Sequence, residues 1–121
     1  MANPFVHVEL GTTDLAKAKS FYQSLFGWSL HDEDVGGGMQ YTMIDVGEGT
    51  GGGMMKQPRP GVPSAWVPYV LVDDLAAATQ KARSLGATVM HDATEVMNAG
   101  SFAIIADPTG AVLGLWQPKA K

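Results

Sequence analysis

Two residues near the start of the chain combine reactive side chains with a spacing that places them side by side. His7 and Glu9 stand in the segment Phe5–Leu10, where aliphatic residues occupy every second position, a pattern typical of a strand with one buried face. His7 and Glu9 therefore share one face, and the aliphatic face should receive the helices. An imidazole beside a carboxylate can bind a metal or act as an acid and a base. The pair is also typical of a histidine that is simply held by its neighbour.

The other candidate groups carry weaker signals. His31 and His91 each precede an aspartate, and we interpret both pairs as strand-start or turn chemistry inherited by duplication, not as metal ligands. The glycine-rich stretch Gly47–Lys56 resembles a phosphate loop, but no helix follows it, and a nucleotide site needs that helix. We predict that it forms turns and a strand whose glycines let a ligand approach the backbone.

An internal repeat organises the chain. The segment DLAKAKSFYQSLFGWSLHD, residues 14–32, returns sixty positions later as DLAAATQKARSLGATVMHD, residues 74–92. The same offset matches Gln57-Pro58 to Gln117-Pro118. Because a repeat of this length reflects a duplicated structural unit, we predict two similar modules.

Each module contains one helix. In the first, apolar residues recur every three or four positions between an N-cap at Asp14 and a C-terminal Gly27, which predicts an amphipathic helix. Its aromatic residues Phe21, Tyr22 and Phe26 lie on the apolar stripe, and we expect them in the core. The second helix is predicted over 74–85.

Alternating and turn patterns place the strands around these helices. The predicted strands are 5–10, 28–32, 40–46, 52–57, 65–72, 88–96, 101–106 and 111–117, with a glycine turn at 36–38. Each module therefore reads βαβββ. We predict one domain over 1–121, with module one at 1–57, a proline-rich linker at 58–64 and module two at 65–121.

Composition excludes several classes of function. The net charge of −4 and the absence of basic runs argue against nucleic acid and anionic membrane partners. Zero cysteines exclude disulfides, thiolate metal sites and a cysteine nucleophile. The N-terminus has no signal-peptide pattern and no segment is long and apolar enough to span a membrane, so a cytoplasmic location is expected. Sheet edges favour self-association, and we expect a homodimer.

Two stretches, HVELGTTDLAKAKSFYQSLFGW and DPTGAVLGLWQ, together with the paired modules, make the chain similar to the vicinal oxygen chelate superfamily, which includes glyoxalase I, bleomycin-resistance proteins and extradiol dioxygenases. The resemblance implies an α+β fold. Its two tandem βαβββ modules would form a curved eight-stranded cup, with the helices outside and the site inside.

In metal-dependent members, the first and last strands of each module supply the ligands of a divalent ion. The resemblance places these positions at His7, Met54, Val67 and Gly114. Only His7 retains a side chain suited to such an ion, so we predict no metal and no other cofactor.

The cup should be apolar and aromatic with a few polar groups, as small-molecule sites usually are. Strand alternation and the repeat place His7 and Glu9 on the cup lining, with Tyr41 and Asp45 as further lining residues. His7 and Glu9 are the candidate acid and base groups if the protein is an enzyme. The predicted ligand-binding residues are Phe5, Met43, Met54, Lys56, Tyr69 and Trp116. Tyrosine and tryptophan rings suit a planar or amphipathic organic ligand.

Three functions remain open from the sequence. The first is a metal-free protein that binds a small organic molecule, as bleomycin-resistance proteins do. The second is a glyoxalase-like lyase or isomerase that uses His7 and Glu9, with or without a metal. The third is a structural module with an empty cup.

Overall fold

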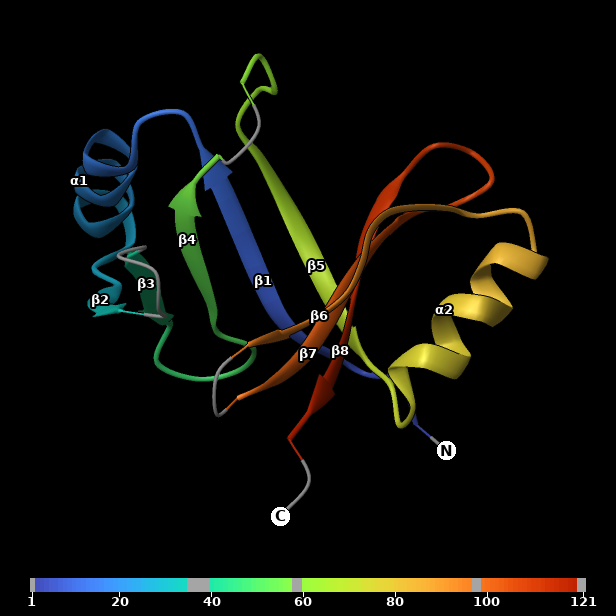
Figure 1. Cartoon of the computed structure of the whole chain (residues 1–121). Coiled ribbons are helices and arrows are strands. Elements are labelled where there is room, and N and C mark those ends of the chain that lie inside the picture. The colour runs from blue at the N-terminus through green and yellow to red at the C-terminus, as the bar shows by residue number, and fades with distance from the viewer. Residues whose placement is uncertain (1, 35–39, 58–59, 97–98, 120–121) are drawn as a thin grey trace. The chain divides into compact units, whose positions relative to one another are not determined.

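A computed structural model describes residues 2–34, 40–57, 60–96 and 99–119. These residues form eight strands and two helices in the predicted order (Figure 1). The strands are β1 (Phe5–Thr12), β2 (Ser29–Asp34), β3 (Gln40–Asp45), β4 (Gly52–Lys56), β5 (Ala65–Leu71), β6 (Thr88–Val96), β7 (Gly100–Ala106) and β8 (Val112–Pro118), and the helices are α1 (Leu15–Phe26) and α2 (Leu75–Ser84). The predicted glycine turn and residues 58–59 of the predicted linker lie outside the described residues.

The chain divides into two compact units. We call residues 7–67 the first unit and residues 1–6 with 68–121 the second unit. The strand order is β2-β3-β4-β1 in the first and β5-β8-β7-β6 in the second. In each unit the first strand lies parallel to the last, and the other pairs are antiparallel. The α+β class and the repeated βαβββ order are therefore confirmed.

Side-chain caps define where both helices begin. The Asp14 carboxylate accepts a hydrogen bond of 3.0 Å from the Lys17 backbone N–H, and Asp74 accepts one of the same length from Ala77. Gly27 follows α1 with a φ of 70°, a left-handed conformation that glycine adopts without steric cost. The predicted boundaries of α1 are thus confirmed by local geometry.

The core of the first unit lies between its sheet and α1. Leu10, Ile44 and Met54 form a buried cluster, and Met54 has no solvent exposure. Partly buried apolar residues pack against this cluster from α1 and the strands: Leu15, Ala18, Tyr22, Trp28, Leu30 and Val46. Because the cluster joins β1, β3 and β4 to the helix, it fixes which sheet face is covered.

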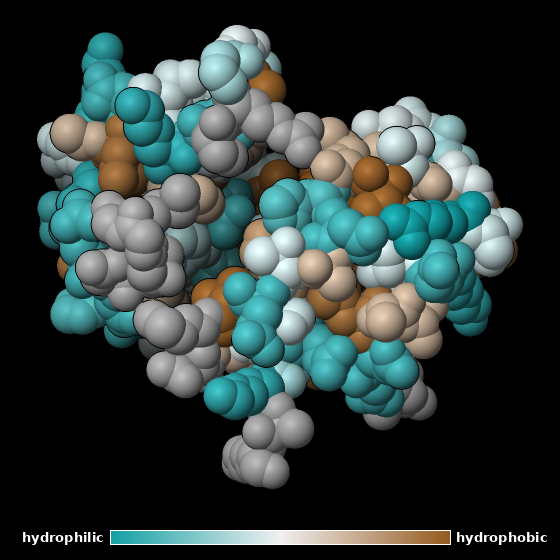
Figure 2. Space-filling view, viewed as in Figure 1, coloured by the Kyte–Doolittle hydropathy of each residue, from teal (hydrophilic) through white to brown (hydrophobic). Residues whose placement is uncertain are grey.

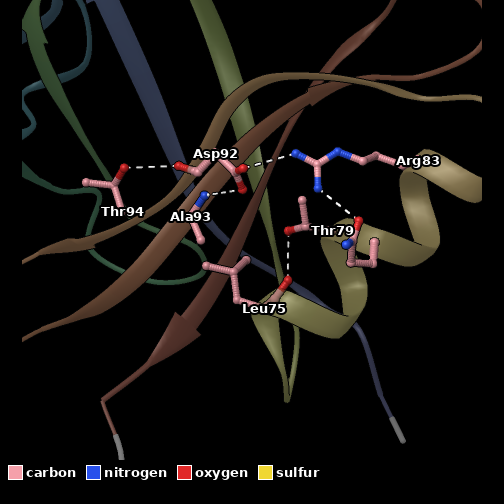
Figure 3. Close-up of polar contacts among 7 residues, drawn as sticks. Leu75, Thr79, Arg83, Asp92, Ala93 and Thr94 are labelled. Atoms are coloured by element: carbon pink, nitrogen blue, oxygen red, sulfur yellow. Dashed lines mark hydrogen bonds and ion pairs between the residues drawn. The ribbon is translucent and has the colours of Figure 1, made fainter.

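The core of the second unit repeats this arrangement with smaller helix residues. Leu75 of α2 is buried with three sheet residues, Ala103, Ile105 and Leu115. Thr79 is also buried, and its hydroxyl donates to the Leu75 carbonyl at 2.7 Å (Figure 3). The polar group inside the helix is therefore satisfied, as buried groups must be.

The repeated aspartates connect a strand to the helix of the same unit. Asp32 lies 2.9 Å from the Lys19 ammonium, and Asp92 lies 3.0 Å from the Arg83 guanidinium (Figure 3). The hydroxyl of Thr42, followed by Lys19, holds the pKa of the exposed Asp32 carboxyl below its usual range. These contacts support the structural interpretation of the aspartates in the duplicated His-Asp pairs.

The aromatic stripe of α1 is less buried than its spacing predicts. Phe21 and Phe26 are each 57% exposed, so the expectation that they lie in the core is wrong. Tyr22 occupies the place against the sheet, and its ring stacks on Trp28 with centroids 5.7 Å apart. Since Phe21 is rotated by about 100° from Tyr22 on a helix, it points away from the core.

On the face shown in Figure 2, hydrophobic residues form separate patches in a mainly polar surface.

Candidate functional site

The sheet of the first unit has a face opposite the core, which we call the His7 face. Leu10 lies in the core, so strand alternation places His7 and Glu9 on the other side of β1. In β3, Thr42 and Ile44 are buried on the core side, which turns the alternate residues Tyr41, Met43 and Asp45 to the His7 face. The prediction that Tyr41, Met43 and Asp45 lie on the same face of the sheet as His7 and Glu9 is therefore supported.

Three side chains on this face form one hydrogen-bonded group, which we call the polar cluster. The Tyr41 hydroxyl donates to Glu9 Oε1 at 3.0 Å and lies 2.6 Å from His7 Nε2. The His7 and Tyr41 rings are nearly parallel, with their centroids 6.1 Å apart. Strands β1 and β3 are not neighbours, because β4 lies between them. The tyrosine side chain must therefore reach across β4.

Gly53 of β4 makes that reach possible. Its register partners are Glu9 on β1 and Met43 on β3. A Cβ atom at Gly53 would overlap the Tyr41 ring and hydroxyl, so the ring lies directly on the glycine backbone. Any side chain at this position would displace the ring, and with it the hydroxyl that joins His7 to Glu9.

With Glu9 ionised, as a glutamate ordinarily is at neutral pH, the hydrogen-bond directions of the polar cluster follow from its protons. Burial lowers the pKa of His7 because it disfavours the charged imidazole, so the ring is neutral at neutral pH. Tyr41 has one hydroxyl proton and donates it to Glu9. The short contact with His7 then requires the Nε2–H tautomer, which donates to the Tyr41 oxygen.

The lowered pKa of His7 predicts a pH-dependent stability. The unfolded chain binds the proton at about 6.5, its ordinary pKa, whereas the folded chain binds it at a lower pH. The contribution of neutral His7 is therefore fully present above about pH 6.5 and is lost as the pH falls through this value towards the folded pKa. We expect His7→Gln to unfold with a shallower pH dependence than wild type, by up to about 1.4 kcal/mol per pH unit in this window.

Urea unfolding between about pH 5 and pH 7.5 measures this difference. His31→Gln is the matched control, because the His31 side chain is 77% exposed. It should keep the wild-type slope. Parallel slopes for wild type and His7→Gln would contradict the prediction.

Two predicted ligand-binding residues of β4 lie on the core side of the sheet and not on the His7 face. Met54 lies in the core, and by alternation Lys56 shares its side, so neither belongs to the His7 face. Gly53 and Met55 take their places there. This corrects the sequence-based prediction for Met54 and Lys56.

The error comes from the register of the repeat. Glu9 pairs with Gly53, and its repeat counterpart Tyr69 pairs with Gly114. Gly53, not Met54, is therefore the structural counterpart of Gly114, and the offset of the last strand is sixty-one residues instead of sixty. The third strand has the same offset, since Met43 pairs with Gly53 and Ile104 with Gly114. One extra residue before the third strand of the second module therefore explains the change of face.

The remaining predicted ligand-binding residues belong to the second unit. Tyr69 is buried, and a Cβ atom at Gly114 would overlap its ring. Trp116 is half-buried and pairs with Phe102, whereas Phe5 is 61% exposed. Phe102 was not predicted, although its alternation with the buried Ala103 places it on the face opposite α2.

Two open cavities lie among the described residues of the first unit. One of about 400 Å³ is bounded by Met43, His31, Asp45 and the glycine-rich turn after β3. Met43 is 37% exposed and lies opposite His31 in the strand register. The other cavity, of about 240 Å³, has Trp28 and Trp66 in its wall. Both are open, and the cavity of about 400 Å³ is of a size that admits a small organic molecule.

The positions implied for a metal do not fit one in this chain. Met54 faces the core, Gly53 in its place has no side chain, and Val67 and Gly114 offer no ligand. Among the described residues, no three His, Asp or Glu side chains lie close enough together to hold an ion. We therefore derive no chemical step through a metal.

Comparisons with known proteins agree with this architecture. Residues 5–115 match the family model described as the Glyoxalase/Bleomycin resistance protein/Dioxygenase superfamily. CFP32 of Mycobacterium bovis, which carries a glyoxylase name, is 41% identical over 91% of this chain and 44% of its own length. The anthracycline biosynthesis protein DnrV of Streptomyces peucetius is 30% identical over 90% of this chain and 45% of its own length. The chain thus spans less than half the length of these relatives.

Solved structures show the same fold at lower identity. The protein BH1468 of Bacillus halodurans has a TM-score of 0.75 and 14% identity, covering 100% of this chain and 98% of its own. Methylmalonyl-CoA epimerase of Mycobacterium tuberculosis has a TM-score of 0.70 and 20% identity, covering 96% of this chain and 88% of its own.

Proposed function

Because the chain belongs to the Glyoxalase/Bleomycin resistance protein/Dioxygenase superfamily, we propose that it binds a small organic molecule on the His7 face without the metal chelate of the metal-dependent members. The observation that carries this proposal is the polar cluster, in which Tyr41 joins His7 to Glu9 across Gly53. A few fixed polar groups beside apolar side chains orient a ligand and select it.

The surroundings of the cluster support binding of an organic ligand. The Tyr41 ring lies against the Gly53 backbone, and strand alternation places Met43 of β3 and Met55 of β4 on the same face. Methionine side chains adapt to ligands of different shape, and a tyrosine ring offers a flat stacking surface. The His7 face therefore combines adaptable methionine side chains with fixed hydrogen-bonding groups.

A second candidate is a glyoxalase-like lyase or isomerase that uses His7 and Glu9 as acid and base. The direct link of both groups to one tyrosine hydroxyl favours it, because protons can pass between groups in hydrogen-bond contact. The glyoxylase name of CFP32 points the same way. The third possibility, a structural module that binds nothing on this face, is an outcome of the experiment below.

Two further properties concern the environment of the protein. Neither described helix is long and apolar enough to cross a membrane. The homodimer stays a prediction.

The test is a pair of histidine variants with an aromatic fragment library screened by NMR. His7→Ala should weaken binding of a fragment that contacts the His7 face by about 1–3 kcal/mol, because a buried hydrogen-bond partner is lost. His31→Ala, which removes an exposed histidine of the same face, should leave the affinity unchanged.

Equal small effects of the two variants would favour the structural module. The protein is dialysed against metal-free buffer before the screen, and its metal content is measured. About one retained ion per chain would contradict the metal-free proposal, whereas turnover of a bound carbonyl compound would favour the lyase or isomerase.

A further inference from the structure

The smaller of the two open cavities in the first unit lies on the core side of the sheet. Its described lining consists of two tryptophans, three aliphatic residues, two glycines and Thr50. One of the aliphatic residues, Ile44, belongs to the core cluster, and two further lining residues, Trp28 and Val46, pack against that cluster. The cavity is therefore separate from the polar cluster, which lies on the opposite face of the sheet.

The two tryptophans in the cavity wall stand almost at right angles. The Trp28 and Trp66 rings have their centroids 6.4 Å apart and their planes at 84°. Aromatic rings attract one another both when they stack with an offset and when they meet edge to face. A ligand ring that is parallel to either indole is nearly perpendicular to the other, so one orientation satisfies both preferences. The wall therefore suits a flat aromatic group.

Tyr22 of α1 holds the two tryptophans in this arrangement. Its ring stacks on Trp28 with the centroids 5.7 Å apart and meets Trp66 edge to face at 5.4 Å. The Trp66 indole N–H donates a hydrogen bond of 3.3 Å to the Tyr22 hydroxyl. Despite these contacts, Trp66 remains 37% exposed. The wall is thus fixed before a ligand binds, which lowers the entropic cost of binding, and part of it is open to solvent.

The polarity of the lining defines which aromatic compounds fit. None of the described lining residues carries a charge, and Thr50 supplies their one side-chain hydroxyl. A charged group placed in the cavity would lose water and gain no opposite charge. A neutral aromatic ring loses far less on leaving water, because it is largely apolar. The lining therefore selects against ions.

We propose that this cavity is a second binding site, separate from the His7 face, for a small neutral molecule with one aromatic ring. An apolar cavity of about 150 Å³ is enough for benzene, so a volume of about 240 Å³ admits a substituted ring. The Phe26 ring lies 4.8 Å from Trp28 and is 57% exposed, so apolar surface continues from the cavity onto α1. The site does not depend on ligand binding to the His7 face.

Four probes built on one six-membered ring test the proposal: benzyl alcohol, cyclohexylmethanol, benzylammonium and benzoate. The whole chain, labelled with nitrogen-15, is titrated with each, and the indole N–H signals of its three tryptophans report binding. We expect benzyl alcohol to move the signals of Trp28 and Trp66, whereas Trp116 of the second unit is the internal reference. The saturated alcohol should bind more weakly because it has no aromatic face. Both charged probes should bind on the order of tenfold more weakly than benzyl alcohol.

A pair of aromatic variants locates the site. Trp66→Ala removes one wall of the cavity and should weaken binding of benzyl alcohol by about tenfold, followed at the Trp28 signal. Phe21→Ala removes an exposed ring of the same unit that is not among the described lining residues, and it should leave the affinity unchanged. If Trp66→Ala does not fold, the order of the four probes on the wild-type chain still decides the question.

Four results would overturn the proposal. A charged probe that binds as tightly as benzyl alcohol would contradict a neutral-ligand site. Shifts confined to the backbone amides of Glu9, Tyr41 and Gly53 would place the probe on the His7 face instead. Indole shifts of Trp28 and Trp66 that follow protein concentration without any probe would assign this surface to contacts between copies of the chain. No indole shift with benzyl alcohol at millimolar concentration would show that the cavity is a packing gap.

Discussion

Met54→Ala is expected to lower the free energy of unfolding by about 2–5 kcal/mol. Met54 is completely buried between Leu10, Ile44 and the apolar side of α1. Truncation to alanine removes most of the buried side chain and leaves a cavity that the sheet can fill only in part, since β4 is paired on both sides. Urea unfolding followed by circular dichroism measures the change.

Met43→Ala is the matched control for this variant. Met43 lies on the neighbouring strand, but on the His7 face, and it is 37% exposed. Its truncation should cost less than about 1 kcal/mol, because little buried area is lost. If both variants lost the same small amount, Met54 would not be a core residue, and the sequence-based prediction that it lines the ligand site would regain support.

The features that the sequence predicted well are those set by local interactions. Asp14 and Asp74 cap their helices through contacts three residues along the chain, and Gly27 ends α1 by its own backbone conformation. Such signals need no knowledge of the tertiary structure. Because the second module repeats the pattern of the first, the same assignment of helix and strands applied to both modules. The predicted order of elements was therefore correct.

The facing of β4 could not be predicted in the same way. Its sequence, Gly-Gly-Met-Met-Lys, does not alternate between apolar and polar residues, so it contains no period-2 signal. Its placement depended on the repeat offset, and a one-residue difference before the last strand reverses every side chain. The pairing of Glu9 with Gly53 and of Tyr69 with Gly114 supplies the correct register.

The polar cluster was predictable in part. His7 and Glu9 were assigned to one face by alternation, and Tyr41 was expected on the same side. The role of Gly53 depends on a ring from β3 that crosses β4, and no sequence pattern encodes such a diagonal contact. The direction of the pKa shift of His7 also needed the structure, since burial and a nearby carboxylate act in opposite directions and burial is the cause that prevails here.

Gly52→Ala should be the other strongly destabilising substitution. A Cβ atom at Gly52 would overlap the carbonyl oxygen of Val8, its register partner on β1. The obstacle is backbone and cannot rotate away, so β4 would have to move from β1 and lose hydrogen bonds of the parallel pair. We expect a loss of about 3 kcal/mol in the free energy of unfolding, at the upper end for overpacked sites, measured by urea unfolding.

Gly11→Ala tests whether the effect comes from the backbone clash. Gly11 lies on β1 in the same strand pair, and a Cβ atom there would meet the Gln57 side-chain nitrogen at 2.9 Å. Because that nitrogen is at the end of a flexible side chain, it can move aside, and alanine also suits a strand better than glycine. The expected change is within about 1 kcal/mol. A loss for Gly11→Ala as large as that for Gly52→Ala would show that any side chain between β1 and β4 is harmful, and that the contact of Gly52 with Val8 is not the cause.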